Sequence, residues 1–503
     1  MLFFSISNFI SFAQIKNRKP NIIIIYVDDL GYGDIGCYGA TLVKTPNVDR
    51  MASNGLRFTD AHCSASTCTP SRFSLLTGSY AFRNKAAILP GDAPLIINPN
   101  TPTLPGMLQK AGYQTGVVGK WHLGLGNGSI NWNEHIKPGP AEIGFDYSFL
   151  IPATGDRVPT VYVENQRVVN ADPSDPITVS YGQKIGNGPT GYENPELLKM
   201  KADRQHSETI VNGISRIGFM SGGKKALWKD EDFPVILTNK AKEFINANKQ
   251  DPFFLYFAFQ DIHVPRVPNK MFQGKTKMGP RGDAIAQMDW CTGEIIKELE
   301  KLGIAENTLV IFSSDNGPVL DDGYVDFAAK KIGTHKPSGI FKGGKYSAFE
   351  AGTRVPTIVY WPTVIKPGVS DALISHIDFY SSLARLTGQK LEGTNQAPDS
   401  FDMLPVLLGK SNKGRTTLVE EAFTLAIRSG SWKYIQPVKS TPPAWFASKN
   451  IPSGLENHQQ LFNLQNDIEE KWNIASIHPD KVNKLQNKLS KIEKAATRPG
   501  YKQ

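Results

Sequence analysis

The run at residues 21–27 (NIIIIYV) is short, rich in β-branched residues and followed directly by two aspartates. Its composition and its position between Pro20 and Asp28 are typical of a strand that is buried on both faces. Four more apolar runs follow, at residues 115–118, 253–259, 309–312 and 357–361. Because a strand buried on both faces needs cover on both sides of its sheet, these runs predict a layered α/β fold.

Helical patterns fall between the apolar runs, at residues 47–54, 104–111, 235–246 and 284–302. Strands that alternate with helices form a large, mostly parallel sheet sandwiched by helices. Gly-, Asn- and Pro-rich stretches at 124–139 and 182–195 are typical of long surface loops near the rim of such a sheet. We predict one large domain over residues 20–412.

The pattern changes after residue 412. Two short hairpin-like runs, at 425–428 and 432–435, precede an amphipathic helical pattern at 479–496. We therefore predict a smaller C-terminal α+β subdomain over residues 413–503, with a short antiparallel sheet.

The first 13 residues, MLFFSISNFISFA, are largely apolar and end in the small-x-small pattern Ser11-Phe12-Ala13. This pattern predicts a signal peptide over residues 1–13 and therefore an exported protein, periplasmic or secreted. No Lys or Arg precedes the apolar part, so a ragged hydrophobic terminus is the alternative interpretation. The sequence has no run of about 18 apolar residues, and we predict no membrane span.

The chain has 56 Lys and Arg against 47 Asp and Glu, a formal net charge of +9, and the basic residues are scattered. A nucleic-acid-binding protein is expected to cluster basic residues with aromatic ones, and only short pairs such as Lys224-Lys225 occur here. The charge therefore favours an anionic substrate over nucleic acid, although a merely basic surface explains the count as well.

Polar residues of catalytic type follow four of the predicted strands. In open α/β sheets, ligands bind beyond the carboxyl ends of the strands, so these side chains are expected to meet at one edge. They are Asp28 and Asp29 after the first run, Lys120 and His122 after the second, Asp261 and His263 after the third, and Asp315 and Asn316 after the fourth.

Four of these residues, Asp28, Asp29, Asp315 and Asn316, offer oxygen ligands. Oxygen ligands suit Ca²⁺ or Mg²⁺ and disfavour zinc. The alternative interpretation of Asp28 and Asp29 is a simple turn, since Asp and Gly are common turn residues. The matching Asp-Asn-Gly after a second buried strand favours the metal site.

The segment CTPSR, residues 68–72, joins a cysteine to an arginine across a helix start. Pro70 suits the first turn of a helix, which places Cys68 beside backbone N–H groups that favour an anion. Arg72 adds a planar donor fork suited to an oxyanion. Cys68 is therefore either a thiolate nucleophile of low pKa or, on the alternative interpretation, a small buried apolar residue.

Cys68-x-Pro-Ser-Arg, followed by Leu76-Thr77-Gly78, resembles the signature of the type I sulfatases of the alkaline phosphatase superfamily. The resemblance extends over about residues 20 to 475 and keeps the order of the family's segments. Those segments are 21–33, 44–58, 68–80, 112–124 (GYQTGVVGKWHLG), 263–265, 314–317, 343–356 (GGKYSAFEAGTRVP) and 461–464. It implies an alkaline-phosphatase-like fold and a sulfuric ester hydrolase.

The resemblance also implies a modified nucleophile and a calcium ion. Cys68 would be oxidised to formylglycine by a separate maturation enzyme, and the two hydroxyls of the hydrated aldehyde would attack sulfur and then release sulfate. Ca²⁺ would be held by residue 68 together with the oxygen ligands Asp28, Asp29, Asp315 and Asn316.

Catalytic roles follow from the same resemblance. Arg72 and Lys120 would steady the hydrated aldehyde and neutralise developing charge. His122 would take the proton of the second hydroxyl, and His263 would protonate the leaving alcohol. Lys345 would contact the sulfate and the leaving oxygen.

The expected function is removal of sulfate from a sulfated glycan, with galactose or N-acetylgalactosamine 6-sulfate as the expected group. The first alternative is a phosphomonoester or phosphonate monoester hydrolase with the same nucleophile. A phosphatase often adds a second metal, and the sequence shows no further Asp/His ligand cluster to bind one. This favours a sulfate ester as the substrate. The second alternative is a non-catalytic glycan-binding relative, which would lack some of the catalytic residues.

Other polar residues carry no motif. We interpret His206, like the remaining histidines outside the motifs, as structural. Asp156, Arg157 and His335 lie in predicted loops from which they either reach the substrate or remain ordinary surface residues.

Overall fold

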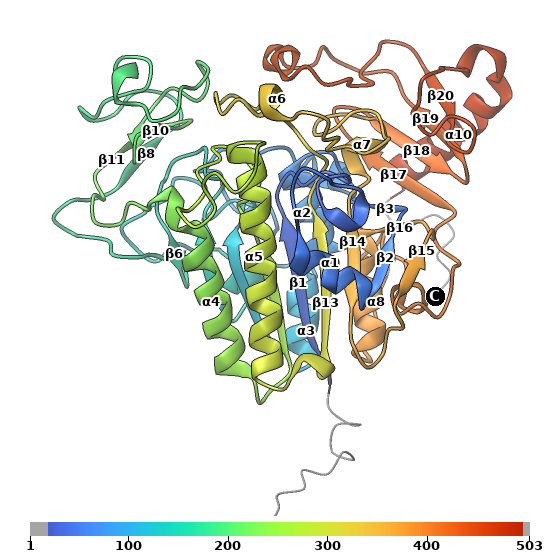
Figure 1. Cartoon of the computed structure of the whole chain (residues 1–503), viewed down its shortest axis with the longest axis horizontal. Coiled ribbons are helices and arrows are strands. Elements are labelled where there is room, and N and C mark those ends of the chain that lie inside the picture. Colours follow the sequence, from blue (N-terminus) through green and yellow to red (C-terminus); the bar gives the residue numbers. More distant parts are fainter. Residues whose placement is uncertain (1–18, 392, 394, 496–503) are drawn as a thin grey trace, which may run out of the picture.

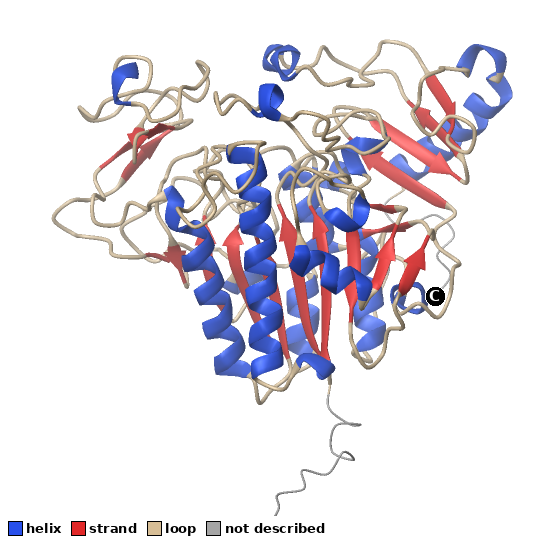
Figure 2. Cartoon of the chain, in the orientation of Figure 1, coloured by secondary structure: helices blue, strands red, loops and turns tan. Residues whose placement is uncertain are grey.

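The computed structural model describes residues 19–391, 393 and 395–495 (Figure 1). The predicted signal peptide, residues 1–13, lies outside the described residues. Figure 2 shows the architecture as a central sheet between two layers of helices, with a second, smaller sheet near the C-terminus. The predicted fold class is confirmed.

The central sheet has ten strands in the order β15-β2-β14-β13-β1-β12-β4-β5-β6-β7. The five strands from β13 to β5 are parallel to one another. Strand β14 runs antiparallel to both of its neighbours, a direction that its apolar run does not encode. The bounds are β1 Asn21–Val27, β2 Leu56–Phe58, β4 Gln114–Lys120, β5 Tyr147–Ile151, β6 Val163–Glu164, β7 Arg167–Val168, β12 Phe253–Ala258, β13 Thr308–Ser314, β14 Thr357–Tyr360 and β15 Gly368–Ser370.

Alternate residues of β1 belong to two different hydrophobic cores. Ile23 and Ile25 pack in the core that contains α1 (Pro46–Ser53), α4 (Phe233–Asn248) and α5 (Pro280–Lys301). Ile22 and Ile24 pack in the core that contains α2 (Cys68–Thr77), α3 (Leu104–Lys110) and α8 (Phe379–Leu386). Successive side chains of a strand point to opposite faces of the sheet. Because β1 is apolar at nearly every position, it needs a layer of helices on each face to bury its side chains.

A long excursion between β5 and α4 forms the far edge of the molecule, drawn in cyan and green in Figure 1. Besides β6 and β7 of the central sheet, it contains two separate two-stranded antiparallel sheets rather than long regular elements. The predicted loops at 124–139 and 182–195 contain no α-helix or β-strand. The pairs are β8 (Thr178–Ser180) with β11 (Phe219–Ser221), and β9 (Ile210–Val211) with β10 (Ile214–Ser215).

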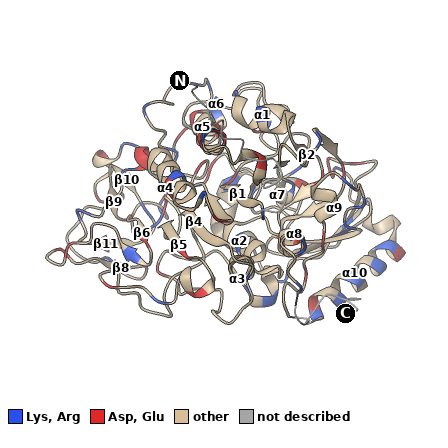
Figure 3. Cartoon of the chain, turned by 90° about the horizontal axis from the view of Figure 1, so that it is seen from below, with Lys and Arg blue, Asp and Glu red and all other residues tan. Residues whose placement is uncertain are grey.

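The C-terminal part forms a four-stranded antiparallel sheet in the order β17-β18-β19-β20, with helix α10 packed on it. Val482, Leu485 and Leu489 of α10 enter the core of this sheet. In the view of Figure 3, Lys and Arg are distributed over many elements, and several lie along α10. The bounds are β17 Thr417–Glu421, β18 Leu425–Ser429, β19 Trp432–Ile435, β20 Gln460–Asn463 and α10 Pro479–Lys494.

The remaining short elements connect these layers. They are β3 Ala61–His62, β16 Ile374–Ser375, α6 Ala328–Lys331, α7 Glu350–Thr353 and α9 Leu404–Leu407. Within the described part of the chain, no helix has the length and apolar character needed to cross a membrane.

Buried charges join the C-terminal sheet to the large domain. Lys433 of β19 is fully buried, and its Nζ lies 3.0 Å from Glu350 Oε1, 3.1 Å from Glu420 Oε2 and 3.5 Å from Glu470 Oε1. Beside it, Arg428 of β18 donates to both carboxylate oxygens of Asp60, at 2.6 and 2.7 Å. A buried pair of this kind is strongly destabilised when one partner is removed, because the other charge is left without compensation.

We expect Lys433→Met to lower the free energy of unfolding by about 3–5 kcal/mol, because Glu350 and Glu420 lose their shared buried cation. Urea unfolding followed by circular dichroism measures the change. Lys439→Met is the matched control, since Lys439 pairs with Glu493 at the surface with 77% of its side chain exposed, and a change within about 0.5 kcal/mol is expected there. Equal losses in the two variants would contradict the buried-charge interpretation.

The same cluster predicts a pH dependence. Burial raises the pKa of Glu470 to about 8, so the folded protein binds a proton there more tightly than the unfolded chain does. The stability that this proton contributes is present below the ordinary glutamate pKa and is lost as pH rises through about 8. Glu470→Gln mimics the protonated form at every pH. Its unfolding free energy minus that of the wild type should therefore increase by about 1 kcal/mol or more as pH rises from 5 to 8.5.

Unfolding free energies of both proteins at the two pH values measure this gain. Glu469→Gln is the control, because Glu469 is the exposed neighbour of Glu470 and pairs only at the surface with Lys471. A difference between Glu470→Gln and wild type that stays constant with pH would contradict the prediction.

Candidate active site

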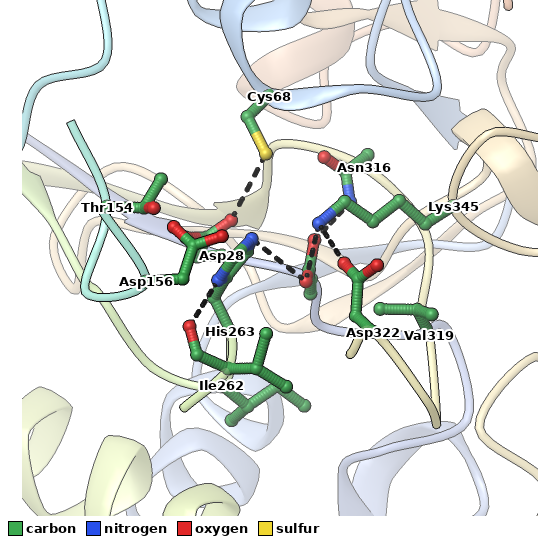
Figure 4. A network of polar contacts seen from close by, with 12 residues as sticks. Asp28, Cys68, Thr154, Asp156, Ile262, His263, Asn316, Val319, Asp322 and Lys345 are labelled. Carbon is green, nitrogen blue, oxygen red and sulfur yellow. Dashed lines mark hydrogen bonds and ion pairs between the residues drawn. The ribbon is translucent and has the colours of Figure 1, made fainter. Parts of the chain in front are cut away.

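The polar residues that follow the central strands lie at one edge of the sheet, but the Asp261 carboxylate accepts a hydrogen bond from Gln287 Nε2 at 2.8 Å and does not line the active-site cavity. Asp28 and Asp315 follow the adjacent parallel strands β1 and β13, and the backbone N–H of Asp315 donates to the carbonyl of Val27 at 3.0 Å. The backbone N–H of Asp28 donates to the carbonyl of Asp261 at 2.9 Å, which fixes the end of β12 beside them. Figure 4 shows the resulting group, with Cys68 above it and Lys345 beside it.

Four of these residues have the arrangement of a metal site. The ligand atoms of Asp28, Asp29, Cys68 and His263 all lie within 4.8 Å of one another, and all four residues are buried. Asn316 Oδ1 is also buried and has no hydrogen-bond partner among the described residues, while its Nδ2 donates to Asp29 Oδ1 at 2.7 Å. An unpaired buried carbonyl oxygen beside two carboxylates fits a hard cation such as Ca²⁺.

Negative charge is concentrated at this point and is balanced by cations. Burial, followed by the nearby Asp315 carboxylate, raises the pKa of Asp28 well above its usual value. Lys120 donates to Asp28 Oδ2, and Arg72 donates to Asp315 Oδ2 through Nε at 2.9 Å and Nη2 at 2.7 Å. These side chains are fully buried, so each cation is held in place by the carboxylate that it neutralises.

Cys68 is the first residue of α2, and Thr67 before it has extended backbone. The start of the helix therefore lies at the predicted position, with Pro70 in the first turn. Cys68 is 2% exposed, and its Sγ lies 3.6 Å from Asp28 Oδ1. Burial raises the pKa of the Cys68 thiol, which favours the small buried residue over the thiolate of low pKa for the unmodified side chain.

His122 lines the active-site cavity, and one of its ring nitrogens is hydrogen-bonded. Its Nε2 donates to the carbonyl of Leu89 at 3.0 Å, which leaves Nδ1 as the hydrogen-bond acceptor. Nδ1 is buried and has no partner among the described residues. Burial, followed by the Lys120 ammonium, lowers the pKa of His122 well below its usual value, which favours the neutral ring.

His263 and Lys345 lie on either side of Asp29. Lys345 Nζ donates to Asp29 Oδ2 at 2.9 Å and to Asp322 Oδ2 at 3.0 Å, and His263 Nε2 lies 3.8 Å from Asp29 Oδ2. His263 Nδ1 contacts the carbonyl of Val264 at 2.6 Å, which turns Nε2 toward the carboxylates. Burial, followed by the Lys345 ammonium, lowers the pKa of His263 to about 4.

A cavity of about 370 Å³ opens above this group. Cys68, His122, His263 and Lys345 line it. Its other polar and aromatic lining residues include several that sequence motifs do not mark. They are Asp156, Arg157, Tyr181, Gln205, His206, Asp322, Tyr346, Phe423, Trp445 and Lys449.

The structure decides between the alternatives for the residues without a motif. Asp156 and Arg157 line the cavity, and so does His206, which the sequence interprets as structural and which is hydrogen-bonded to Asp203. His335 does not line the cavity: its Nε2 donates to Asp34 Oδ1 at 2.8 Å inside the protein. No sequence signal marks His206, because it reaches the cavity from the irregular excursion between β5 and α4.

The sulfatase family model matches residues 20–389. This chain belongs to the sulfatase family. It is 53% identical over 482 residues to the N-acetylgalactosamine-6-O-sulfatase of Bacteroides thetaiotaomicron, covering 95% of this chain and 94% of that protein. It is 31% identical over 477 residues to human arylsulfatase A, covering 91% of this chain and 83% of that protein. The chain is therefore a sulfatase.

Solved structures agree with this assignment. A structure described under the metabolism of multiple glycosaminoglycans by Bacteroides thetaiotaomicron has a TM-score of 0.93 at 52% identity, covering 95% of this sulfatase and 100% of that chain. The phosphonate monoester hydrolase of Agrobacterium radiobacter has a TM-score of 0.58 at 16% identity, covering 94% and 95% of the two chains. The second likeness shows that the hydrolase shares the fold.

We expect Ca²⁺ to raise the unfolding free energy of this sulfatase, because it would bind the folded carboxylate cluster and not the unfolded chain; at 100 times its Kd the gain is about 2.7 kcal/mol. Asn316→Ala removes the unpaired acceptor and should weaken Ca²⁺ binding at least about 10-fold. Thermal unfolding with Ca²⁺ and with chelator, together with calorimetric titration of the chelated protein, measures both effects. Asn457→Ala, at an exposed position, is the control; no stabilisation of the wild type by Ca²⁺ would contradict the metal site.

Proposed function

We propose that this sulfatase removes the 6-O-sulfate from galactose or N-acetylgalactosamine in a sulfated glycan. The observation that carries the proposal is the 53% identity, over 95% of the chain, to an N-acetylgalactosamine-6-O-sulfatase. The gathering of Cys68, His122, His263 and Lys345 around one cavity supports it, because a catalytically inactive glycan-binding relative is expected to have lost some of them.

The proposal includes a formylglycine derived from Cys68 and a Ca²⁺ ion on Asp28, Asp29, Asp315 and Asn316. Three buried carboxylates, the unpaired Asn316 Oδ1 and the nearby Cys68 side chain fit these two groups. When present, the formylglycine supplies the hydrated aldehyde that attacks sulfur, and Ca²⁺ supplies a Lewis acid for a sulfate oxygen.

The residues around position 68 would orient and deprotonate the nucleophile. Arg72 and Lys120, fixed by their carboxylates, hold positive charge beside the reacting atoms. His122 lines the cavity, the Leu89 carbonyl fixes the orientation of its ring, and its Nδ1 has no partner among the described residues, so Nδ1 can accept a hydroxyl proton. His122 is accordingly the proposed base for sulfate release.

His263 and Lys345 would act on the leaving alcohol. Lys345 carries its charge into the cavity between two carboxylates and can neutralise the departing oxygen. The arrival of an anionic sulfate favours the protonated form of His263, whose Nε2 is turned toward the site and can donate the proton.

A specific observation favours sulfate over phosphate monoesters. Phosphatases of this type often add a second metal, and the other described group of metal-ligand type is Asp60, His62 and Glu350. That group is occupied by side-chain cations: Arg354 lies 2.8 Å from Asp60 Oδ1, and Lys433 lies 3.0 Å from Glu350 Oε1. Side-chain cations therefore already neutralise the carboxylates that a second metal would need in this group.

We also propose that the chain is exported and that a formylglycine-generating enzyme converts Cys68. The leader-like pattern over residues 1–13 supports export. Because Cys68 is 2% exposed in the folded protein, the maturation enzyme would act on the chain before folding is complete.

The wild type is expected to release free sulfate from N-acetylgalactosamine 6-sulfate or galactose 6-sulfate, and Cys68→Ser should lower kcat/KM at least about 1,000-fold, because it lacks the second hydroxyl. Ion chromatography of sulfate and phosphate released from 6-, 4- and 3-sulfated and phosphorylated sugars, with Ca²⁺ and with chelator, is the measurement. Cys37→Ser is the control, since Cys37 is half-buried outside the cavity. Dominant phosphate release would overturn the proposal, as would full activity of Cys68→Ser.

A further inference from the structure

A chain of four buried polar side chains joins helix α2 to strand β13 and has no role in the mechanism proposed above. The Tyr26 hydroxyl lies 2.9 Å from Ser71 Oγ and 3.0 Å from His376 Nδ1. His376 Nε2 lies 2.8 Å from Ser313 Oγ. None of the four is more than 1% exposed, and we call Ser71, Tyr26, His376 and Ser313 the His376 chain.

The donors and acceptors of the His376 chain follow from the carbonyl of Pro356. A carbonyl oxygen can only accept, so the Ser313 hydroxyl, 2.8 Å away, donates to it. His376 Nε2 therefore donates to Ser313 Oγ, which leaves His376 Nδ1 to accept from the Tyr26 hydroxyl. Tyr26 in turn accepts from the Ser71 hydroxyl, so each member of the chain has a partner for its proton.

The surroundings of the His376 chain favour one protonation state. Burial, followed by the neighbouring His62, lowers the pKa of His376 to about 3, which favours the neutral ring. Burial also raises the pKa of Tyr26 well above its usual value, which favours the hydroxyl over the phenolate. A neutral chain whose protons are all shared suits a fixed support better than a group that exchanges protons with a substrate.

The His376 chain meets α2 on the face that carries the nucleophile position. Ser71 and Arg72 lie three and four residues after Cys68, and residues at these spacings share one face of a helix. Tyr26 makes a second contact with this face, because the guanidinium carbon of Arg72 lies 5.6 Å from the centre of the Tyr26 ring. The chain therefore supports the turn of α2 that contains residue 68 and Arg72.

Two connections thus join the first turn of α2 to β13. The first is charged: Arg72 Nε and Nη2 donate to Asp315 Oδ2 at 2.9 and 2.7 Å. The second is the neutral His376 chain, which reaches β13 at Ser313, two residues before Asp315. A pair that meets at one carboxylate oxygen fixes a distance, whereas a second connection at Ser71 also fixes the angle at which this turn faces the cavity.

We propose that His376 and Tyr26 are positioning residues that act through Ser71. They hold the first turn of α2 at the angle that directs residue 68 and Arg72 at the sulfate ester. This inference rests on the roles that the proposed function gives to residue 68 and Arg72, and it applies to any sulfate ester. Neither His376 nor Tyr26 lines the cavity, so both act on the substrate only through other residues.

The test measures kcat and KM of Tyr26→Phe and His376→Leu with the best substrate of the wild type among the sulfated sugars and 4-nitrophenyl sulfate. We expect kcat to fall about 10- to 100-fold in each variant while KM changes less than about 3-fold, because the reacting groups are misplaced and the sulfate contacts remain. Tyr434→Phe is the matched control, since Tyr434 is equally buried and its hydroxyl accepts from Gln459 Nε2 at 3.3 Å in the C-terminal part.

The double variant Tyr26→Phe/His376→Leu distinguishes positioning from a general loss of packing. Residues that act through one connection lose it only once, so kcat of the double variant should stay within about 3-fold of the slower single variant, whereas independent packing defects multiply. His376→Asn retains an acceptor for the Tyr26 hydroxyl and should recover most of the kcat that His376→Leu loses. Wild-type kcat in Tyr26→Phe, or losses that multiply in the double variant, would overturn the proposal.

Two further measurements keep the result specific. Every variant is co-expressed with a formylglycine-generating enzyme, and its kcat is divided by the converted fraction of residue 68, measured by mass spectrometry of the peptide that contains it. Circular dichroism checks folding, and Tyr26→Phe, which removes a single hydroxyl, remains informative where His376→Leu does not fold. Full activity of Cys68→Ser would overturn the proposed mechanism and this inference with it, whereas its expected loss together with wild-type kcat in Tyr26→Phe would overturn this inference alone.

Discussion

The repulsion among three buried carboxylates is the constraint around which this sulfatase is built. Asp28, Asp29 and Asp315 follow two neighbouring parallel strands, so the sheet itself forces their negative charges together. Each carboxylate therefore needs a cation at a fixed place, and Lys120, Arg72 and Lys345 provide them. The side chains proposed to stabilise the reaction are the same ones that allow the strand ends to be buried.

The C-terminal part of the chain continues this arrangement of charges. Lys433 of β19 neutralises Glu350, the first residue of α7. Glu350 lies five residues after Lys345, which lines the cavity. Lys449, from the short helix at Ala444–Lys449, lies 2.9 Å from Asp322 and lines the cavity together with Trp445. The C-terminal part thus contributes both to the support of the active site, through Lys433, and to the lining of its cavity, through Lys449.

The sequence predicts the inner layers of the molecule closely. The limits of β1 match those of its apolar run, and helices α1, α3, α4 and α5 lie within a few residues of their patterns, because burial on one face or both is written in periodicity. The strand-end residues were predicted to meet because parallel strands share a carboxyl edge. The family resemblance then assigned the roles of Cys68 and the lysines, which periodicity alone does not.

The outer parts of the site were not predictable by the same reasoning. His206 meets Asp156 from 50 positions away through an excursion without regular periodicity, and Asp322 meets Lys449 across 127 positions. Such contacts depend on how loops pack, and no local pattern records them. The direction of β14 is similar: an apolar run marks a buried strand and carries no information on its orientation.

The burial of Cys68 also limits when this residue can be modified. If Cys68 is converted as proposed, a molecule that folded with an unconverted thiol would have the same sheet, charge pairs and cavity as an active one, yet the proposed maturation enzyme would have no access to the buried thiol. A preparation would then contain converted and unconverted molecules with the same fold. Its specific activity would depend on the rate of Cys68 conversion relative to the rate of folding during synthesis, and not on the stability of the folded protein.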